Sequence, residues 1–224
     1  MDRMRKYLEK LALRHTAIGQ KYLEACGLNA GLLREIEALK HDNEMLRALA
    51  LTDELTGLGN RRYFEGELDR LFKVAERGNM RLSLAMLDLD DFKGVNNAYG
   101  HLAGDAVLRE TAKRINDGIR GTDVAARYGG EEFAVIMPAT DRHGAMSRAM
   151  RIHEKISEKP YQIGVNGAAY RLYITASIGV ATYYPDFGRM SASQLLQHAD
   201  EQLYRAKGEG KNRVCYYDDF KSVL

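Results

Sequence analysis

The residues best suited to chemistry in this chain are two groups of carboxylates, each placed at one end of an apolar run. One group is Glu131 and Glu132, which follow the adjacent glycines Gly129 and Gly130 and precede the apolar residues 133–137. Paired glycines allow positive φ and the close approach of a ligand, so this segment predicts a β-hairpin tip that holds both acids at the mouth of a strand. An ordinary acidic turn would have the same four residues, so the interpretation depends on the rest of the chain.

The other group is Asp88, Asp90 and Asp91, which end the almost wholly apolar run 82–87. Such a run predicts a strand buried on both faces, and the alternation of side chains puts Asp88 and Asp90 on the same side of it. Like charges at the end of a buried strand repel each other, so a divalent cation is their natural partner, and hard oxygen ligands favour Mg²⁺ or Mn²⁺. Nucleotidyl-transfer sites hold two such ions between a pair of carboxylate clusters.

With these two clusters the chain resembles the GGDEF family of diguanylate cyclases, in its GGEEF form. The similarity covers residues 51 to about 217 and rests on five motifs in the family's order and approximate spacing: Asp88-Leu89-Asp90-Asp91-Phe92-Lys93, Asn96, Tyr99-Gly100-His101, Gly104-Asp105 and Gly129-Gly130-Glu131-Glu132-Phe133. Membership implies that the protein condenses two GTP molecules into cyclic di-GMP and releases pyrophosphate.

The resemblance also implies a role for each acid. Asp88, the carbonyl of Leu89 and Glu131 would coordinate two Mg²⁺ or Mn²⁺ ions in each active site. Glu132 would support them and could help to deprotonate the attacking 3′-hydroxyl. The predicted catalytic residues are therefore Asp88, Glu131 and Glu132.

Asn96 and Asp105 are the pair that the resemblance places on guanine. An amide and a carboxylate together can meet the donor and acceptor edge of that base, whereas adenine presents a different pattern. Taken singly, each residue is more often a helix cap. Asn97 departs from the Asn-Asp pair that is common in the family, which affects a local hydrogen bond but not the base contact at Asn96.

The phosphates of the substrate are assigned to backbone groups and two lysines. By resemblance, the backbone at Phe92 and Lys93 and the side chains of Lys207 and Lys211 would hold them, with Gly129 and Gly130 close by. Lys211 stands where an arginine is more usual, so the charge is kept while the bidentate fork is lost. Solvated basic residues at a helix end are the alternative interpretation of both lysines.

Arg120 and Asp123 match the spacing of the family's RxxD inhibitory site. Arg120 could engage a guanine edge or phosphate of bound cyclic di-GMP, Asp123 could accept from a guanine, and Arg151 on a following helix is a secondary arginine. Without that match, the pair would be read as a surface ion pair worth less than about 1 kcal/mol.

The remaining pattern predicts the elements that position these residues. Helices are expected over 63–76, 92–99, 104–119, 141–158 and 191–208, and strands over 173–181 and 214–217, with a rigid turn at 51–62. Hairpins at Gly129-Gly130 and at Asn166-Gly167 require antiparallel strand pairs. The predicted fold of residues 51–224 is one α/β domain with a mixed, mainly antiparallel sheet covered by helices, resembling the palm of polymerases and nucleotidyl cyclases.

Residues 1–50 are rich in helix formers and predict a helical stalk. Apolar positions follow one another at alternating spacings of four and three from Met4 to Ala50, with Ile36 and Asn43 at a positions of the better half. A parallel homodimer would pair Glu35 with Lys40 and Asp42 with Arg47 of the partner helix. The alternatives are a single amphipathic helix packed on its own domain, a hairpin broken at Gly27 and Gly31, or part of a truncated sensory segment.

Composition narrows the class of protein. A net charge of +2 with 33 basic and 31 acidic residues gives no case for nucleic-acid binding, and 45% hydrophobic residues in 224 suffice for a core. Cys26 and Cys215 share no metal-ligand spacing with the six histidines, which indicates a reducing, cytoplasmic compartment. We find no apolar run of membrane-spanning length and no signal peptide at residue 1, so no membrane contact is expected.

The preferred function is a GTP-condensing cyclase that works as a homodimer, because each domain would bind one GTP and present it to the other. The alternative is a catalytically silent receptor that binds GTP or cyclic di-GMP and signals through the stalk. Retention of Asp88, Glu131 and Glu132 favours the enzyme. Cyclisation of a single nucleotide is disfavoured because it needs no RxxD site.

Overall fold

The computed structural model describes residues 2–165, 167–187 and 190–217, and for parts of the first helix it describes the backbone alone. The chain divides into two compact units, residues 1–50 and 51–224. Each unit is described by itself below. Within the described ranges, no helix combines the length and the apolar character needed to cross a membrane.

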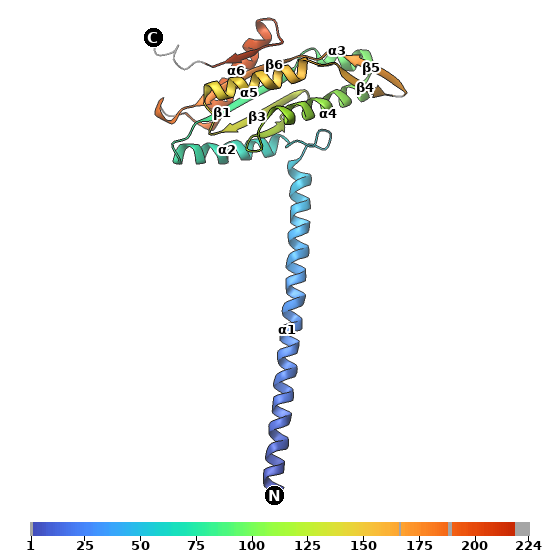
Figure 1. Ribbon diagram of the computed structural model, residues 1–224, viewed down its shortest axis with the longest axis vertical. Helices are drawn as coiled ribbons and strands as arrows, with labels where there is room; N and C mark the ends of the chain where they lie inside the picture. The colour runs from blue at the N-terminus through green and yellow to red at the C-terminus, as the bar shows by residue number, and fades with distance from the viewer. Residues whose placement is uncertain (1, 166, 188–189, 218–224) are drawn as a thin grey trace. The chain divides into compact units, whose positions relative to one another are not determined.

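Helix α1 (Asp2–Leu51) is continuous (Figure 1). It runs through Gly27 and Gly31, so the predicted alternative of a break at these glycines is wrong. Each glycine costs a helix about 1 kcal/mol relative to alanine, which the good helix formers around them offset. Apolar side chains of α1 that the structure describes are exposed in this chain: Met4, Tyr7, Leu11, Leu13, Ile18, Leu32, Leu33, Ile36 and Leu39.

Several residues of the expected stalk seam have side chains outside the described part of the structure. They include Asn43 and the predicted pair Asp42 and Arg47, together with Leu8, His15, Tyr22, Ala25, Asn29 and Leu46. The parallel coiled coil therefore stays a prediction.

A five-stranded sheet lies at the centre of the second unit, with strand order β2-β3-β1-β6-β7. The β1–β3, β1–β6 and β2–β3 pairs are antiparallel and the β6–β7 pair is parallel, which confirms the predicted mixed, mainly antiparallel sheet. The strands are β1 (Leu82–Leu89), β2 (Val124–Arg127), β3 (Glu132–Pro138), β6 (Ala176–Tyr183) and β7 (Val214–Tyr216). Every residue of β1 and β6 is buried, as expected for central strands covered on both faces.

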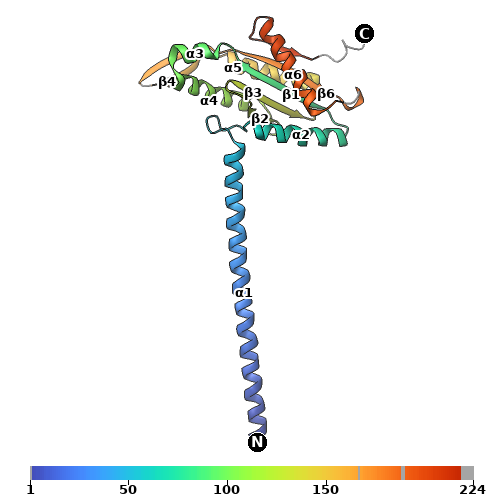
Figure 2. The same cartoon turned by 180° about the vertical axis from the view of Figure 1, so that it is seen from behind.

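Helices cover both faces of the sheet, and Figures 1 and 2 show this arrangement from opposite sides. Apolar residues of α4 and α5 pack with Ala85, Leu87 and Leu89 of β1, whereas those of α2 and α6 pack with Leu84 and Met86. The helices are α2 (Arg61–Arg77), α3 (Phe92–Tyr99), α4 (His101–Gly118), α5 (Arg142–Ser157) and α6 (Ala192–Gly208). Even-numbered residues of β1 thus face α6, the helix that carries Lys207.

A second, two-stranded sheet is formed by β4 (Tyr161–Val165) and β5 (Ala168–Leu172), which pair antiparallel as predicted. Asn166 lies outside the described residues, and Gly167 has φ +80°. Rings of Tyr99 and Tyr170 make an edge contact at 5.1 Å between centroids, so this hairpin lies beside α3.

The boundaries of one predicted strand need correction. The strand expected over 173–181 begins at Ala176 and extends to Tyr183 as β6, followed by a short 3₁₀ helix, η1 (Pro185–Phe187). Pairing starts at Ala176 because its partner Leu89 is the last residue of β1. The other expected elements begin and end within a few residues of their predicted limits, and Asn60, Asp141 and Ser191 cap the starts of α2, α5 and α6.

Candidate active site

The two groups of carboxylates meet at one edge of the central sheet. Strand β3 lies next to β1 with Asp88 opposite Glu132, and the Leu89 N–H donates to the Glu131 carbonyl at 3.3 Å. The β2–β3 hairpin carries Gly129 and Gly130 at its tip, as the sequence indicates. Acids that are far apart in the sequence are therefore neighbours in the fold.

Asp88 is the most enclosed carboxylate of this edge. It is 6% exposed, and its Oδ2 lies 2.7 Å from Nζ of Lys207. Burial raises the pKa of the Asp88 carboxyl above its ordinary value, and the Lys207 ammonium offsets part of that rise. Burial also raises the pKa of Glu131, and the Asp88 charge raises it further. A cation placed between Asp88 and Glu131 would remove this repulsion.

The donor set fits a divalent ion that arrives together with a nucleotide. The described residues contain no group of three or more His, Cys, Asp or Glu side chains that could hold a metal ion by themselves. Mg²⁺ is usually bound by one or two carboxylates, with carbonyl groups, water and substrate phosphates completing its shell. Asp88, Glu131 and the Leu89 carbonyl supply hard oxygen donors of this kind.

Gly129 lies against the carboxylate of Glu132 at the hairpin tip. A Cβ at this position would collide with Oε2 of Glu132, and the N–H groups of Tyr128 and Gly129 both donate to the Glu132 carbonyl, at 2.8 and 3.2 Å. The tip therefore folds back tightly over Glu132. A larger residue at Gly129 would displace the carboxylate.

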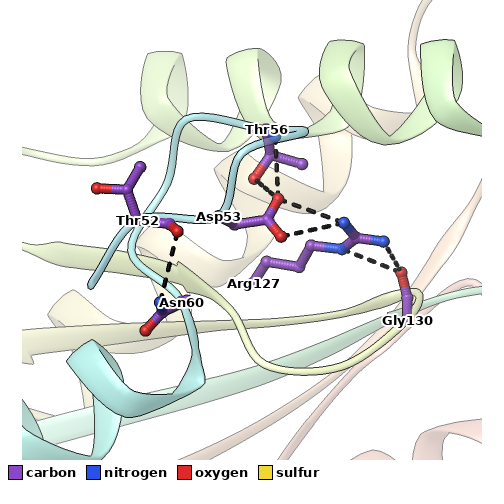
Figure 3. A network of polar contacts seen from close by, with 6 residues as sticks. All are labelled: Thr52, Asp53, Thr56, Asn60, Arg127 and Gly130. Atoms are coloured by element: carbon purple, nitrogen blue, oxygen red, sulfur yellow. Dashed lines mark hydrogen bonds and ion pairs between the residues drawn. The ribbon is translucent and has the colours of Figure 1, made fainter. Parts of the chain in front are cut away.

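A polar network that the sequence did not reveal joins the same tip to the turn at 51–62 (Figure 3). Arg127 donates to the Gly130 carbonyl through Nε at 3.2 Å and Nη2 at 2.7 Å. Its Nη1 donates to both carboxylate oxygens of Asp53, at 3.3 and 3.1 Å. Asp53 in turn accepts from the N–H and hydroxyl of Thr56, at 2.9 and 2.6 Å. The predicted turn at 51–62 is thereby tied to the peptide that precedes Glu131.

Both lysines assigned to phosphates lie at this edge and face acids. Lys211 Nζ is 2.6 Å from Oδ1 of Asp91, a residue with φ +57° that precedes α3 without capping it. The hydrogen bond to Asp91 raises the pKa of Lys211. Phe92 and Lys93 form the first turn of α3, where backbone N–H groups have no partner within the helix and suit an anion.

The two residues assigned to guanine come from neighbouring helices. Asn96 lies on α3 and Asp105 on α4, and Gly100, with φ +82°, makes the turn between them. Oδ1 of Asn96 lies directly against Gly104, where a Cβ would collide with it. Within the described part of the chain, neither the Asn96 nor the Asp105 side chain makes a hydrogen bond, so both can meet a ligand.

The RxxD segment differs from its prediction in one respect. The Asp123 side chain is 1% exposed and accepts from Nη1 of Arg148 at 2.9 and 2.7 Å and from the Arg120 N–H at 2.9 Å. A buried carboxylate needs such a cation, which the sequence analysis did not single out. The carboxylate is thus engaged inside the protein, and the alternative of a surface ion pair with the Arg120 guanidinium is wrong.

The two arginines assigned to the inhibitory site, one in the RxxD segment and one on α5, lie on the surface. Arg120 and Arg151 are exposed, and Nη2 of Arg151 donates to the Asp117 carbonyl at 3.1 Å.

A family model and individual relatives of this chain point to the same protein family. The model of the family described as "Diguanylate cyclase, GGDEF domain" matches residues 50–213. Response regulator PleD of Caulobacter vibrioides is 41% identical over 181 residues, which is 81% of this chain and 39% of PleD. Diguanylate cyclase A of Treponema denticola is 39% identical over 185 residues, covering 81% of this chain and 48% of that protein. The chain thus spans less than half the length of these two relatives.

Solved structures give the same result. The coiled coil and GGDEF domain of DgcB from Caulobacter crescentus, in complex with c-di-GMP, is 36% identical with a TM-score of 0.76, covering 84% of this chain and 96% of that one. The active GGEEF domain of a diguanylate cyclase from Vibrio cholerae is 30% identical with a TM-score of 0.64, covering 71% and 97%.

Proposed function

Because the chain belongs to the GGDEF family of diguanylate cyclases, we propose that it condenses two molecules of GTP into cyclic di-GMP and releases two molecules of pyrophosphate. The observation that carries this proposal is the meeting of Asp88 and Glu131 at one sheet edge, where Lys207 pairs with Asp88 and Lys211 pairs with Asp91. Such an edge offers oxygen donors for metal ions and cations for phosphates within one site.

The acids would bind the metal ions, and the lysines would neutralise the phosphates. Asp88, the Leu89 carbonyl and Glu131 would hold two Mg²⁺ or Mn²⁺ ions, which supply charge neutralisation and an acidified 3′-hydroxyl. Glu132 supports Glu131 and helps to accept the proton of that hydroxyl. Lys207 and Lys211 would exchange their carboxylate partners for phosphate oxygens when the nucleotide binds.

The remaining contacts fix the substrate in place. N–H groups of Phe92 and Lys93 at the start of α3 would donate to phosphate oxygens, and the lack of side chains at Gly129 and Gly130 lets the phosphates approach the hairpin. Asn96 and Asp105 would pair with the edge of guanine, which favours GTP over ATP.

Condensation of two nucleotides requires two domains. Each domain would present one GTP to the other, so that both 3′-hydroxyls attack in line, and the working enzyme is a homodimer. We propose that α1 brings the domains together as a parallel coiled coil, an idea supported by its exposed apolar side chains. A solved relative includes a coiled coil beside its GGDEF domain.

Cyclic di-GMP would also act as an inhibitor, bound at Arg120 and Arg151. Support comes from the exposure of both arginines and from one relative, DgcB, that was solved in complex with c-di-GMP. Asp123 would accept from a guanine only after Arg148 releases it. While it is paired with Arg148, Asp123 also accepts a hydrogen bond from the Arg120 N–H and so fixes the backbone at Arg120.

Incubation of the purified protein with GTP and Mg²⁺, followed by chromatography of the products, tests the proposal. We expect cyclic di-GMP and pyrophosphate, with a specific activity that rises with protein concentration as dimers form. Dimeric protein that yields no cyclic di-GMP would contradict the proposal and favour a receptor that only binds the nucleotide.

A further inference from the structure

Asp90 has a different set of partners from its neighbour Asp88. It is 8% exposed, and both of its carboxylate oxygens accept hydrogen bonds from the protein. Oδ1 accepts from the Ser177 hydroxyl at 2.8 Å, and Oδ2 accepts from the Thr175 hydroxyl at 2.7 Å and from the Asn212 N–H at 3.0 Å. The Asp90 N–H donates to the Thr175 carbonyl at 2.9 Å. Asp90 therefore joins the end of β1 to the start of β6 and to the loop after α6.

The loop that Asp90 contacts has an unusual backbone. Gly210, Lys211 and Asn212 follow one another with φ of +112°, +64° and +49°. A lysine seldom adopts such a conformation, and it persists only where surrounding contacts impose it. Two contacts do so here: the Lys211 N–H donates to the Ala206 carbonyl at 3.0 Å, and the Asn212 N–H donates to Asp90. The bond to Asp90 links the loop to the end of β1, and directly after the loop the Ile178 N–H of β6 donates to the Arg213 carbonyl at 2.9 Å.

We propose that Asp90 is a positioning residue for the triphosphate: it holds the loop so that Lys211 lies over the end of β1. Lys211 Nζ then stays 2.6 Å from Asp91 and beside the edge where Lys207 meets Asp88. The inference rests on the proposed function, because it assigns Lys211 to the phosphates of GTP. In this assignment Asp90 would contact neither the metal ions nor the nucleotide.

This assignment differs from the simpler one, in which Asp90 is a third metal ligand beside Asp88. The two assignments predict different results for Asp90→Asn. An amide oxygen can still accept from the Asn212 N–H, and its NH₂ group can donate to the Ser177 hydroxyl, which is able to accept. If Asp90 is a positioning residue, Asp90→Asn keeps the loop in place. If Asp90 is a metal ligand, the same change removes the negative charge that binds the ion.

The experiment measures the affinity of the parent and of each variant for a non-hydrolysable GTP analogue and for GMP, in the presence of Mg²⁺. In Asp90→Ala we expect the analogue to bind about tenfold more weakly, as for loss of a hydrogen bond to a charged group, with GMP affinity nearly unchanged. Asp90→Asn should bind the analogue within about threefold of the parent, since its hydrogen bonds are retained. An Asp90→Asn protein as weak as Asp90→Ala, or an Asp90→Ala protein equal to the parent, would overturn the proposal.

Two variants of the loop itself keep the test decisive if Asp90→Ala does not fold. Asn212→Pro deletes the N–H that donates to Asp90 and cannot adopt the φ of +49° at this exposed position, so it releases the loop and should lose the preference for the analogue over GMP. Asn212→Gly keeps that N–H and tolerates positive φ, so it should bind like the parent. Parent-like binding by Asn212→Pro would contradict the proposal.

The two proposals can fail separately. A parent protein that does not prefer the GTP analogue to GMP would overturn both the proposed function and this inference. A parent that does prefer it, with an unaffected Asp90→Ala variant, would overturn this inference alone.

Discussion

The two halves of the candidate site are prepared in opposite ways. At the acidic edge, Asp88, Asp90 and Asp91 each have partners from distant parts of the chain, among them Lys207 and Lys211. On the base side, Asn96 and Asp105 make no side-chain hydrogen bonds within the described residues, and Asn96 is placed by close packing against Gly104.

The difference follows from what each half must do. Clustered charges would repel one another or demand heavy solvation, so the acidic edge needs counter-charges before any substrate arrives. Polar groups that discriminate a base must instead stay free, because selectivity arises when the wrong base leaves them unpaired. We therefore propose that the acidic edge performs the chemistry and that the base side selects the nucleotide.

The largest effect is expected at the acidic edge. Glu131→Ala and Asp88→Ala should each lower turnover by about 10³-fold or more, since each removes a donor from the proposed metal ions. Steady-state production of cyclic di-GMP measures this, and Glu201→Ala is a control for loss of an exposed carboxylate on α6. Thermal unfolding should remain cooperative near the parent temperature. Normal turnover in Glu131→Ala would end the metal assignment.

Next in size is the change expected on the base side. The double variant Asn96→Ala, Asp105→Ala should lose roughly 10²-fold or more of the preference for GTP over ATP, because a site without polar groups cannot distinguish the two bases. Competitive titration with non-hydrolysable analogues of both nucleotides measures the preference. Unchanged discrimination would mean that the guanine contact lies elsewhere in the fold.

A smaller effect is expected in the network that joins Arg127 to Asp53 and to the Gly130 carbonyl. Arg127→Ala should reduce turnover by about tenfold to a hundredfold, because the Gly130 carbonyl loses the charge-assisted bonds that fix the peptide before Glu131. Arg61→Ala is the matched control: Arg61 begins α2, and its guanidinium lies 4.6 Å from the centroid of the Tyr128 ring in the β2–β3 connection, but it is not bonded to Gly130. If both variants lose activity equally, the tip is not positioned through Arg127.

The smallest effect concerns pH. The Asp88 and Glu131 carboxyls have raised pKa values, so they take up protons at higher pH than ordinary carboxyls, and metal binding should fail earlier as the pH is lowered. Lys207 counteracts the rise at Asp88, so Lys207→Gln should move the acid limb of Mn²⁺ binding to higher pH. Lys211→Gln should move it less, because Lys211 is the weaker influence on Asp88. Equal shifts, or a shift to lower pH, would argue against this electrostatic coupling.

Local patterns in the sequence predicted much of this molecule. An apolar run that ends in acids identified β1, paired glycines identified the β2–β3 hairpin, and the two hairpins led to an antiparallel sheet. The meeting of the two acidic groups was expected from two-metal chemistry and the family resemblance, and the fold brings it about by pairing Asp88 with Glu132 on the adjacent strands β1 and β3.

Contacts between distant segments could not be predicted in the same way. Asp53 and Arg127 meet only when the turn at 51–62 is laid beside β2, where the Arg127 N–H donates to the Gly59 carbonyl at 2.8 Å. Alternation placed Asp90 on the side of Asp88, but the bond of Asp90 to Asn212 depends on a loop in which Lys211 has positive φ, which the preferences of lysine do not indicate. The same holds for Arg148, the buried partner of Asp123.

The separation of chemistry from base selection is tested most directly by one variant, Glu131→Gln, assayed for both binding and turnover. The account predicts that this protein binds a GTP analogue in preference to an ATP analogue by the same ratio as the parent, yet forms no measurable cyclic di-GMP from GTP. Formation of cyclic di-GMP at the parent rate, or loss of the guanine preference, would contradict it.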